Sequence, residues 1–230
     1  MTYIHTTLLH RTVLMAASVL TVGIMAACAQ SKPMMSTTTG SKPVMGTGAA
    51  RAVAESDTSK TVLLEPLQAM VLKIQRLQST GDADFDYAFQ AKVYNEGIQN
   101  FLTKEVQNGK DSLLKQMAQT MLTTAKAEES TINDILRQLK PSRPNQAFMQ
   151  QQKKNIDAMN TQLQQASTGD SLGSDIDKNF KMLLVDQRKA ALDLTTTYLQ
   201  YGRSTSLKAY AEQFSGKIKE EMAKVKGMTE

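Results

Sequence analysis

Two stretches of the 230-residue chain resemble each other and decide its fold. Residues 82–109 read DADFDYAFQAKVYNEGIQNFLTKEVQNG, and residues 175–202 read DIDKNFKMLLVDQRKAALDLTTTYLQYG. A shift of 93 residues aligns Asp82, Asp84 and Gly109 with Asp175, Asp177 and Gly202. The same shift aligns Leu114-Lys115, just after the first stretch, with Leu207-Lys208, just after the second. The second half of the chain therefore repeats the first.

Apolar residues recur in both copies at alternating steps of four and three residues. One such seam comprises Tyr87, Ala91, Tyr94, Ile98 and Phe101, aligned with Phe180, Leu184, Gln187, Ala191 and Leu194. The next comprises Leu114, Ala118, Met121, Ala125, Glu128 and Ile132, aligned with Leu207, Ala211, Phe214, Ile218, Glu221 and Val225. This spacing keeps residues on one face of a helix. Each copy therefore predicts a helical hairpin, and two hairpins that cannot bury their seams alone should close into a four-helix bundle.

The pattern is helical from about residue 62 almost to the end of the chain. It predicts six helices, near residues 62–79, 83–108, 111–139, 145–167, 175–201 and 204–227, and Pro66 is expected in the first turn of the first helix. Aromatic residues make up only 5% of the chain and Trp is absent, which favours helices over strands. We expect an all-α fold in which residues 61–140 and 141–230 form two repeats of one bundle, with 62–79 and 145–167 flanking the hairpins.

The first 28 residues are typical of a bacterial lipoprotein signal. The charged residue Arg11 precedes the apolar run TVLMAASVLTVGI, and Ala26 and Ala27 precede Cys28, the only cysteine of the chain. This order describes a secretory signal whose cleavage site resembles a lipobox, and the apolar run is short for a membrane span. We predict a signal peptide over residues 1–27 and lipidation of Cys28. The alternative is an ordinary signal with an incidental cysteine.

A lipidated Cys28 predicts anchoring in the bacterial cell envelope. Ala29 rather than Asp follows the cysteine, which by resemblance to enterobacterial sorting implies the outer membrane and a position facing the periplasm. Residues 28–60 are rich in Ser, Thr, Gly, Ala and Met, so we predict a flexible tether there.

The placement of histidine limits the chemistry. His5 and His10 fall within the predicted signal, and removing residues 1–27 leaves 26 basic and 22 acidic residues and no histidine. Histidine-dependent hydrolases, His-ligated zinc and carboxylate-histidine di-iron sites are thereby excluded. The small basic excess does not indicate nucleic-acid binding. We predict a non-enzymatic binding or scaffold protein without a cofactor, whose partners are the membrane and an unidentified protein or small molecule.

Two seam positions hold carboxylates where the pattern requires apolar residues. Glu128 and Glu221 occupy them in the two copies, and an unpaired carboxylate there would be costly, so each should be protonated or paired. Tyr94 and Gln187 lie on the facing seams. Arg188 is the cation expected to pair with Glu128 or Glu221. The alternative places Arg188 at the surface, with Tyr94 and Gln187 satisfying the glutamates.

The first copy resembles a bacterial family called domain of unknown function 305. The resemblance rests on Thr80-Gly81-Asp82-Ala83-Asp84-Phe85-Asp86-Tyr87, Gly97, Gly109-Lys110-Asp111, Leu114-Lys115, Ala118-Gln119 and Glu128, and extends more weakly over residues 62–227. It implies an exported, ferritin-like four-helix bundle, and copper binding in some members through a Met-x-x-His-His-Gln-Gly-Ala motif. A second exported family of ferritin-like predicted outer-membrane proteins would imply the same architecture.

The histidines of that motif are replaced in both copies. They fall on Tyr94 and Asn95 in the first copy and on Gln187 and Arg188 in the second. The resemblance therefore implies a degenerate metal site, with positions Tyr94, Asn95, Glu128, Gln187, Arg188 and Glu221, and predicts neither a bound metal nor catalytic residues. Residual binding of a divalent metal by Glu128 and Glu221, with Glu96 and Asp186, is the alternative function.

Overall fold

The computed structural model describes residues 47–228, which form six α-helices and no β-strand. The helices are α1 (Thr47–Arg76), α2 (Ala83–Asn108), α3 (Ser112–Gln138), α4 (Gln146–Thr168), α5 (Ile176–Tyr201) and α6 (Thr205–Gly227). The all-α fold is therefore confirmed. The predicted signal peptide, Cys28 and the first part of the predicted tether lie outside the described residues.

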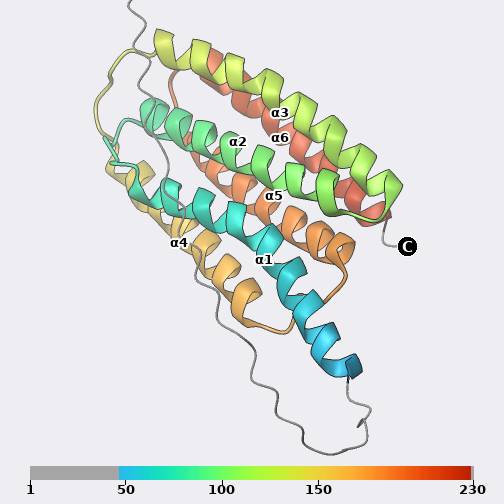
Figure 1. Ribbon diagram of the computed structural model, residues 1–230. Coiled ribbons are helices and arrows are strands. Elements are labelled where there is room, and N and C mark those ends of the chain that lie inside the picture. The colour runs from blue at the N-terminus through green and yellow to red at the C-terminus, as the bar shows by residue number, and fades with distance from the viewer. Residues whose placement is uncertain (1–46, 229–230) are drawn as a thin grey trace, which may run out of the picture. The chain divides into compact units, whose positions relative to one another are not determined.

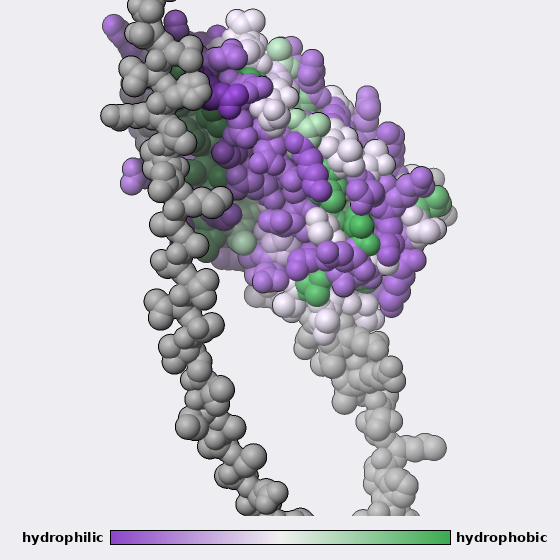
Figure 2. Space-filling view, turned by 45° about the horizontal axis from the view of Figure 1, so that its top comes forward, coloured by the Kyte–Doolittle hydropathy of each residue, from purple (hydrophilic) through white to green (hydrophobic). Residues whose placement is uncertain are grey.

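The two predicted hairpins lie side by side, as Figure 1 shows. Helix α2 packs on α3, α5 packs on α6, and the hairpins meet where α2 contacts α5. Helices α1 and α4 flank α2 and α5, and they also contact each other. The apolar seams fill the interior, while the face in Figure 2 is mostly hydrophilic with small separate hydrophobic patches. The chain thus forms a bundle of two hairpins with two flanking helices.

The internal repeat is visible in the helix ends. Helices α2 and α5 both contain 26 residues and begin 93 positions apart. Asp82 and Asp175 cap them, each accepting hydrogen bonds from the backbone N–H groups two and three residues ahead. Gly109 and Gly202 follow their last turns. The pseudo-symmetry predicted from the sequence is therefore also present in the structure.

Helix α1 differs from its sequence-based prediction in two ways. It begins at Thr47 rather than near residue 62, so that residues 47–60, which we assigned to the tether, are helical. The run Ala-Ala-Arg-Ala-Val-Ala at positions 49–54 has a high helix propensity, which accounts for the longer helix. Pro66 lies inside the helix, not in its first turn. Proline lacks an N–H group, so the helix forgoes one hydrogen bond at this position.

Helices α1 and α2 approach each other closely because α2 carries a glycine at their contact. A Cβ atom built on Gly97 would lie 2.4 Å from the Met70 Cβ. Met70 is fully buried and fills the space above this glycine.

None of the described helices is both long enough and apolar enough to cross a membrane.

Candidate functional site

The seam between the hairpins contains a buried ion pair. The Arg188 Nη2 atom lies 2.8 Å from Glu221 Oε2, and the Arg188 side chain is only 2% exposed. Arg188 Nη1 also donates a hydrogen bond of 3.3 Å to the Tyr94 hydroxyl. The predicted pairing of Arg188 with a seam glutamate is confirmed, and the partner is Glu221.

The second seam glutamate has a different partner. Glu128 on α3 pairs with Lys217 on α6, a cation that the sequence analysis missed. The Lys217 Nζ atom also lies 5.1 Å from the centre of the Phe214 ring. Lys217 stands three residues after Phe214 and four before Glu221, a spacing that keeps it near the seam. The two glutamates thus occupy equivalent positions, and both of their cations come from the second copy.

Tyr94 and Gln187 meet at equivalent positions of the two copies. The Tyr94 hydroxyl donates a hydrogen bond of 3.2 Å to the Gln187 backbone carbonyl. Burial raises the pKa of Tyr94, and the charge of Arg188 offsets part of this rise. The Gln187 side-chain oxygen is buried and has no donor among the described residues.

Asn95 is separated from the other predicted positions. Its side-chain nitrogen donates a hydrogen bond of 3.0 Å to the Ala125 carbonyl on α3, and its oxygen accepts one from Gln99. The structure therefore brings Tyr94, Gln187, Arg188 and Glu221 together. Asn95 instead joins α2 to α3.

The seam cluster is closed to ligands. The void beside Tyr94 has a volume of about 10 Å³, which is at most the space of one water molecule. Both glutamates are neutralised by cations, and within residues 58–228 no three His, Cys, Asp or Glu side chains are grouped to hold a metal ion. Loss of either member of the buried Arg188–Glu221 pair would leave a buried charge without its partner, so we assign this pair to the fold.

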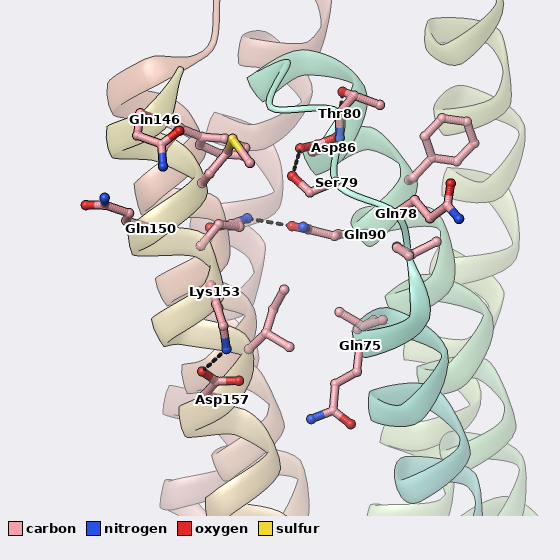
Figure 3. Close-up of a pocket in the computed structure, with 17 residues that line it drawn as sticks. Gln75, Gln78, Ser79, Thr80, Asp86, Gln90, Gln146, Gln150, Lys153 and Asp157 are labelled. Atoms are coloured by element: carbon pink, nitrogen blue, oxygen red, sulfur yellow. Dashed lines mark hydrogen bonds and ion pairs between the residues drawn. The ribbon is translucent and has the colours of Figure 1, made fainter. Parts of the chain in front are cut away.

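A larger site lies between α1, α2 and α4, where the sequence analysis expected none. It is a groove of about 700 Å³, within the range of ligand pockets. We call it the glutamine groove, because its polar lining is dominated by six carboxamide side chains, Gln75, Gln78, Gln90, Gln146, Gln150 and Gln152. Its apolar lining consists of Ile74, Leu77, Phe89, Phe148, Met149 and Ile156. Figure 3 shows Gln146, Gln150 and Lys153 on α4 at one side of the groove, with Gln75 and Gln78 on the opposite side.

Two buried glutamines cross the base of this groove. Gln152 Nε2 donates a hydrogen bond of 2.6 Å to Gln90 Oε1, drawn in Figure 3, and contacts the Leu194 carbonyl at 3.5 Å. The Leu194 carbonyl can only accept, which favours this orientation of the Gln152 amide. Its oxygen is left without a donor from any described residue. An N–H or O–H group of a ligand that reached it would satisfy this oxygen.

The charged residues of the groove are already paired. Asp86 accepts hydrogen bonds from Ser79 Oγ at 2.6 Å, from Thr80 N at 2.8 Å and from Gly81 N at 3.0 Å, and so closes the turn before α2. Lys153 Nζ lies 2.7 Å from Asp157 at the rim. The remaining polar groups are neutral amides. The lining therefore suits a neutral ligand with an apolar body.

The sequence contained a weak signal for this groove. The segment QAFMQQQ at residues 146–152 combines glutamines with Phe148 and Met149, and Phe89 is an aromatic residue outside the α2 seam. Phe89 is 44% exposed at the groove, which is unusual for so large an apolar side chain. These features look like an ordinary solvated helix face until α1 and α4 are placed side by side.

Comparison with known proteins gives no relative from which a function could be transferred. No family model, curated protein or solved structure matches the chain. A function must therefore be inferred from the residues and their geometry.

Proposed function

We propose that the chain is a non-enzymatic binding protein of the bacterial envelope that holds a neutral small molecule in the glutamine groove. The observation that carries this proposal is the groove itself, which has a volume of about 700 Å³ and a lining that includes Gln152, whose buried oxygen has no donor among the described residues. The ligand has an apolar body for Phe89, Met149 and Ile156. It carries an N–H or O–H group for Gln152.

The anchor is part of the same proposal. The apolar run before Ala26-Ala27-Cys28 supports cleavage and acylation at Cys28, which would tether the bundle to a membrane, in our proposal the outer membrane facing the periplasm. The resemblance to domain of unknown function 305 supports export and a ferritin-like bundle. The replaced histidines support a ligand other than copper, and the lack of histidine after residue 10 supports a binding role rather than catalysis.

Residual divalent-metal binding has weaker support. It would need Glu128 and Glu221 as ligands, and these carboxylates pair with Lys217 and Arg188. A cation entering the seam would have to displace both positive charges and would meet their repulsion. We therefore place binding in the glutamine groove and assign no metal to the seam.

The neutral probe N-phenyl-1-naphthylamine tests the groove, because it joins an apolar body to one N–H donor. The chain to use is residues 28–230 with Cys28→Ser, since the core lies between Leu63 and Val225. We expect a fluorescence rise on binding. In a spectrum of ¹³C-labelled methionine methyl groups, the Met149 signal should shift while that of the buried Met159 stays in place.

Matched variants place the probe within the molecule. Phe89→Asp should weaken binding by about tenfold, while Leu113→Asp, which changes another exposed apolar residue on α3, should leave it unchanged. Equal affinity in both variants would contradict the proposal. So would a titration that shifts Met182 and Met228 but not Met149.

A further inference from the structure

One end of the bundle gathers several elements that are distant in the sequence. Ser59 Oγ on α1 donates a hydrogen bond of 3.1 Å to the Ser174 carbonyl, just before α5. Asp177 in the first turn of α5 accepts hydrogen bonds of 2.9 Å from Lys110 N and 3.1 Å from Asp111 N, before α3. Figure 1 shows α6 ending beside the start of α3. We call this the proximal end, because the chain from Cys28 enters the bundle there through α1.

The proximal end exposes apolar side chains. Among the described residues only four large apolar side chains are exposed, namely Leu72, Phe89, Leu113 and Met228. Leu113 in the first turn of α3 is the most exposed of them at 65%, and Met228 after α6 is 40% exposed. Neither belongs to the glutamine groove. Leu113 and Met228 thus place two exposed apolar side chains at the proximal end.

The same end carries a cationic groove between α5 and the end of α6. This lysine groove has a volume of about 670 Å³, and its lining consists of Lys178, Lys181, Lys189, Lys226, Asp186, Met182, Val185, Val225 and Met228. Four lysines thus face one acid. Asp186 lies 3.5 Å from Lys189, and Lys181 forms no ion pair within the described part of the chain. The groove therefore combines a positive rim with an apolar floor.

The acids at the helix starts near this groove accept hydrogen bonds from backbone N–H groups. Asp111 accepts hydrogen bonds from Leu113 N and Leu114 N, and Asp177 accepts the two backbone bonds of the turn before α3. Asp175 accepts two in the same way at the start of α5 and lies 3.9 Å from Lys178. Their charges face the positive ends of helix dipoles. The Lys178 and Lys189 side chains stay 78% and 53% exposed beside their acidic neighbours, so these lysines still present positive charge at the surface of the groove.

We propose that the proximal end docks on a bilayer containing anionic phospholipid, with Leu113 and Met228 among the head groups and the lysine groove on the phosphates. The proposal rests on the anchor proposed for Cys28, since an anchored chain would bring this end to the membrane. Charge complementarity and exposed apolar residues favour an anionic lipid surface. Thr80 in the turn before α2 and Gln146 at the start of α4 lie at the opposite end, so docking would turn the glutamine groove away from the membrane.

Vesicle binding by residues 28–230 with Cys28→Ser tests the docking without the acyl chain. The chain should co-sediment with vesicles of equal parts phosphatidylglycerol and phosphatidylcholine, and not with pure phosphatidylcholine, and added salt should weaken binding. The double variant Lys178→Glu/Lys181→Glu should lose at least about 25-fold in affinity, at about fivefold for each lysine removed. Leu113→Asp should also weaken binding.

The matched control is Lys140→Glu/Lys154→Glu, which makes the same change in net charge on exposed residues outside both grooves. Its affinity should fall by much less than that of the test variant, and circular dichroism should show both folded. Equal losses in test and control, or no preference for phosphatidylglycerol, would overturn the docking. The mass of the mature wild-type chain reports acylation separately, so that a missing anchor and a failed docking are distinguishable.

Discussion

The Tyr198 hydroxyl donates a hydrogen bond of 2.8 Å to Asp84 Oδ1, and this contact joins the two copies of the repeat. The same Asp84 carboxylate accepts hydrogen bonds of 2.9 Å from Arg203 N and 3.0 Å from Ser204 N. An acid in the first copy therefore holds the start of the second copy's last helix. Burial, followed by the hydrogen bond and charge of Asp84, raises the pKa of Tyr198.

Glu105 occupies the equivalent position of Tyr198 in the first copy. It lies beside Asp177, which in turn holds the start of α3, so the contact is repeated with an acid in place of a phenol. Burial, the hydrogen bond with Asp177 and the charge of Asp177 raise the pKa of Glu105 to about 8. With a pKa of about 8, Glu105 is protonated at neutral pH, and its carboxyl proton can then be donated to Asp177.

This protonation predicts a stability that falls as the pH rises from about 4.5 to about 8. Glu105 binds its proton up to about pH 8 in the folded chain, but only up to its ordinary pKa of 4.5 when unfolded. Between these values the folded state holds the extra proton, so the free energy of unfolding decreases as the pH rises. The slope contributed is on the order of 1 kcal/mol per pH unit.

Urea unfolding of wild type and Glu105→Gln across this pH window measures the effect. Glutamine keeps a donor for Asp177 and cannot ionise, so the variant should lack the downward slope and exceed the wild type in stability near pH 8. Parallel pH profiles of the two proteins would contradict the assignment.

The Arg188–Glu221 pair predicts a strong dependence of stability on pairing. Glu221→Leu leaves the Arg188 charge buried without its partner and should lower the free energy of unfolding by about 3–5 kcal/mol. The double variant Arg188→Met/Glu221→Leu should recover most of this loss, because an apolar pair replaces a buried ionic one. Chemical denaturation of the single and double variants measures the coupling.

Glu128→Leu is the matched comparison for Glu221→Leu. Glu128 and its partner Lys217 both remain partly exposed, so the loss should be nearer 1 kcal/mol, about the upper end for a surface pair. Equal losses for Glu128→Leu and Glu221→Leu would mean that the burial of Arg188 does not set the cost.

The sequence predicted the fold well because the signals that define it are local. Asp82 and Gly109 mark the ends of α2, and the same residues recur 93 positions later around α5. The steps of four and three residues then identify the buried faces. The start of α1 was missed, because residues 47–60 combine small, polar and helix-favouring residues without a clear period.

The candidate sites were predicted less completely, because they depend on the arrangement of helices in space. Arg188 could be assigned a glutamate partner, since a carboxylate on an apolar seam needs a cation. Lys217 was missed because it stands beside the seam rather than on it. The glutamine groove joins the end of α1 to α4, and no sequence pattern of either helix predicts that they meet.

The glycines after α2 and α5 predict a packing conflict on substitution. A Cβ atom on Gly109 would lie 2.3 Å from the Glu105 carboxyl oxygen, and one on Gly202 would lie 2.2 Å from the Tyr198 ring. Gly109→Ala should therefore destabilise the fold by about 1–3 kcal/mol. In the double variant Gly109→Ala/Glu105→Ala the added loss from the glycine substitution should shrink but not vanish, because the Glu105 carbonyl oxygen lies 2.7 Å from the same Cβ position. Strictly additive losses in thermal or urea unfolding would argue against the steric explanation.

The Gln152 oxygen, which has no hydrogen-bond donor within the described part of the chain, predicts that this residue serves the ligand more than the fold. Replacing Gln90 and Gln152 together by leucine removes a buried amide pair and its unsatisfied oxygen, so the free energy of unfolding should hold or rise. The affinity for N-phenyl-1-naphthylamine should nevertheless fall by about tenfold, because the acceptor for its N–H is lost. Gln151→Leu, which changes an exposed glutamine of α4 outside the groove, should change neither quantity appreciably. A double variant that loses stability and keeps its affinity for the probe would assign Gln152 to the fold alone.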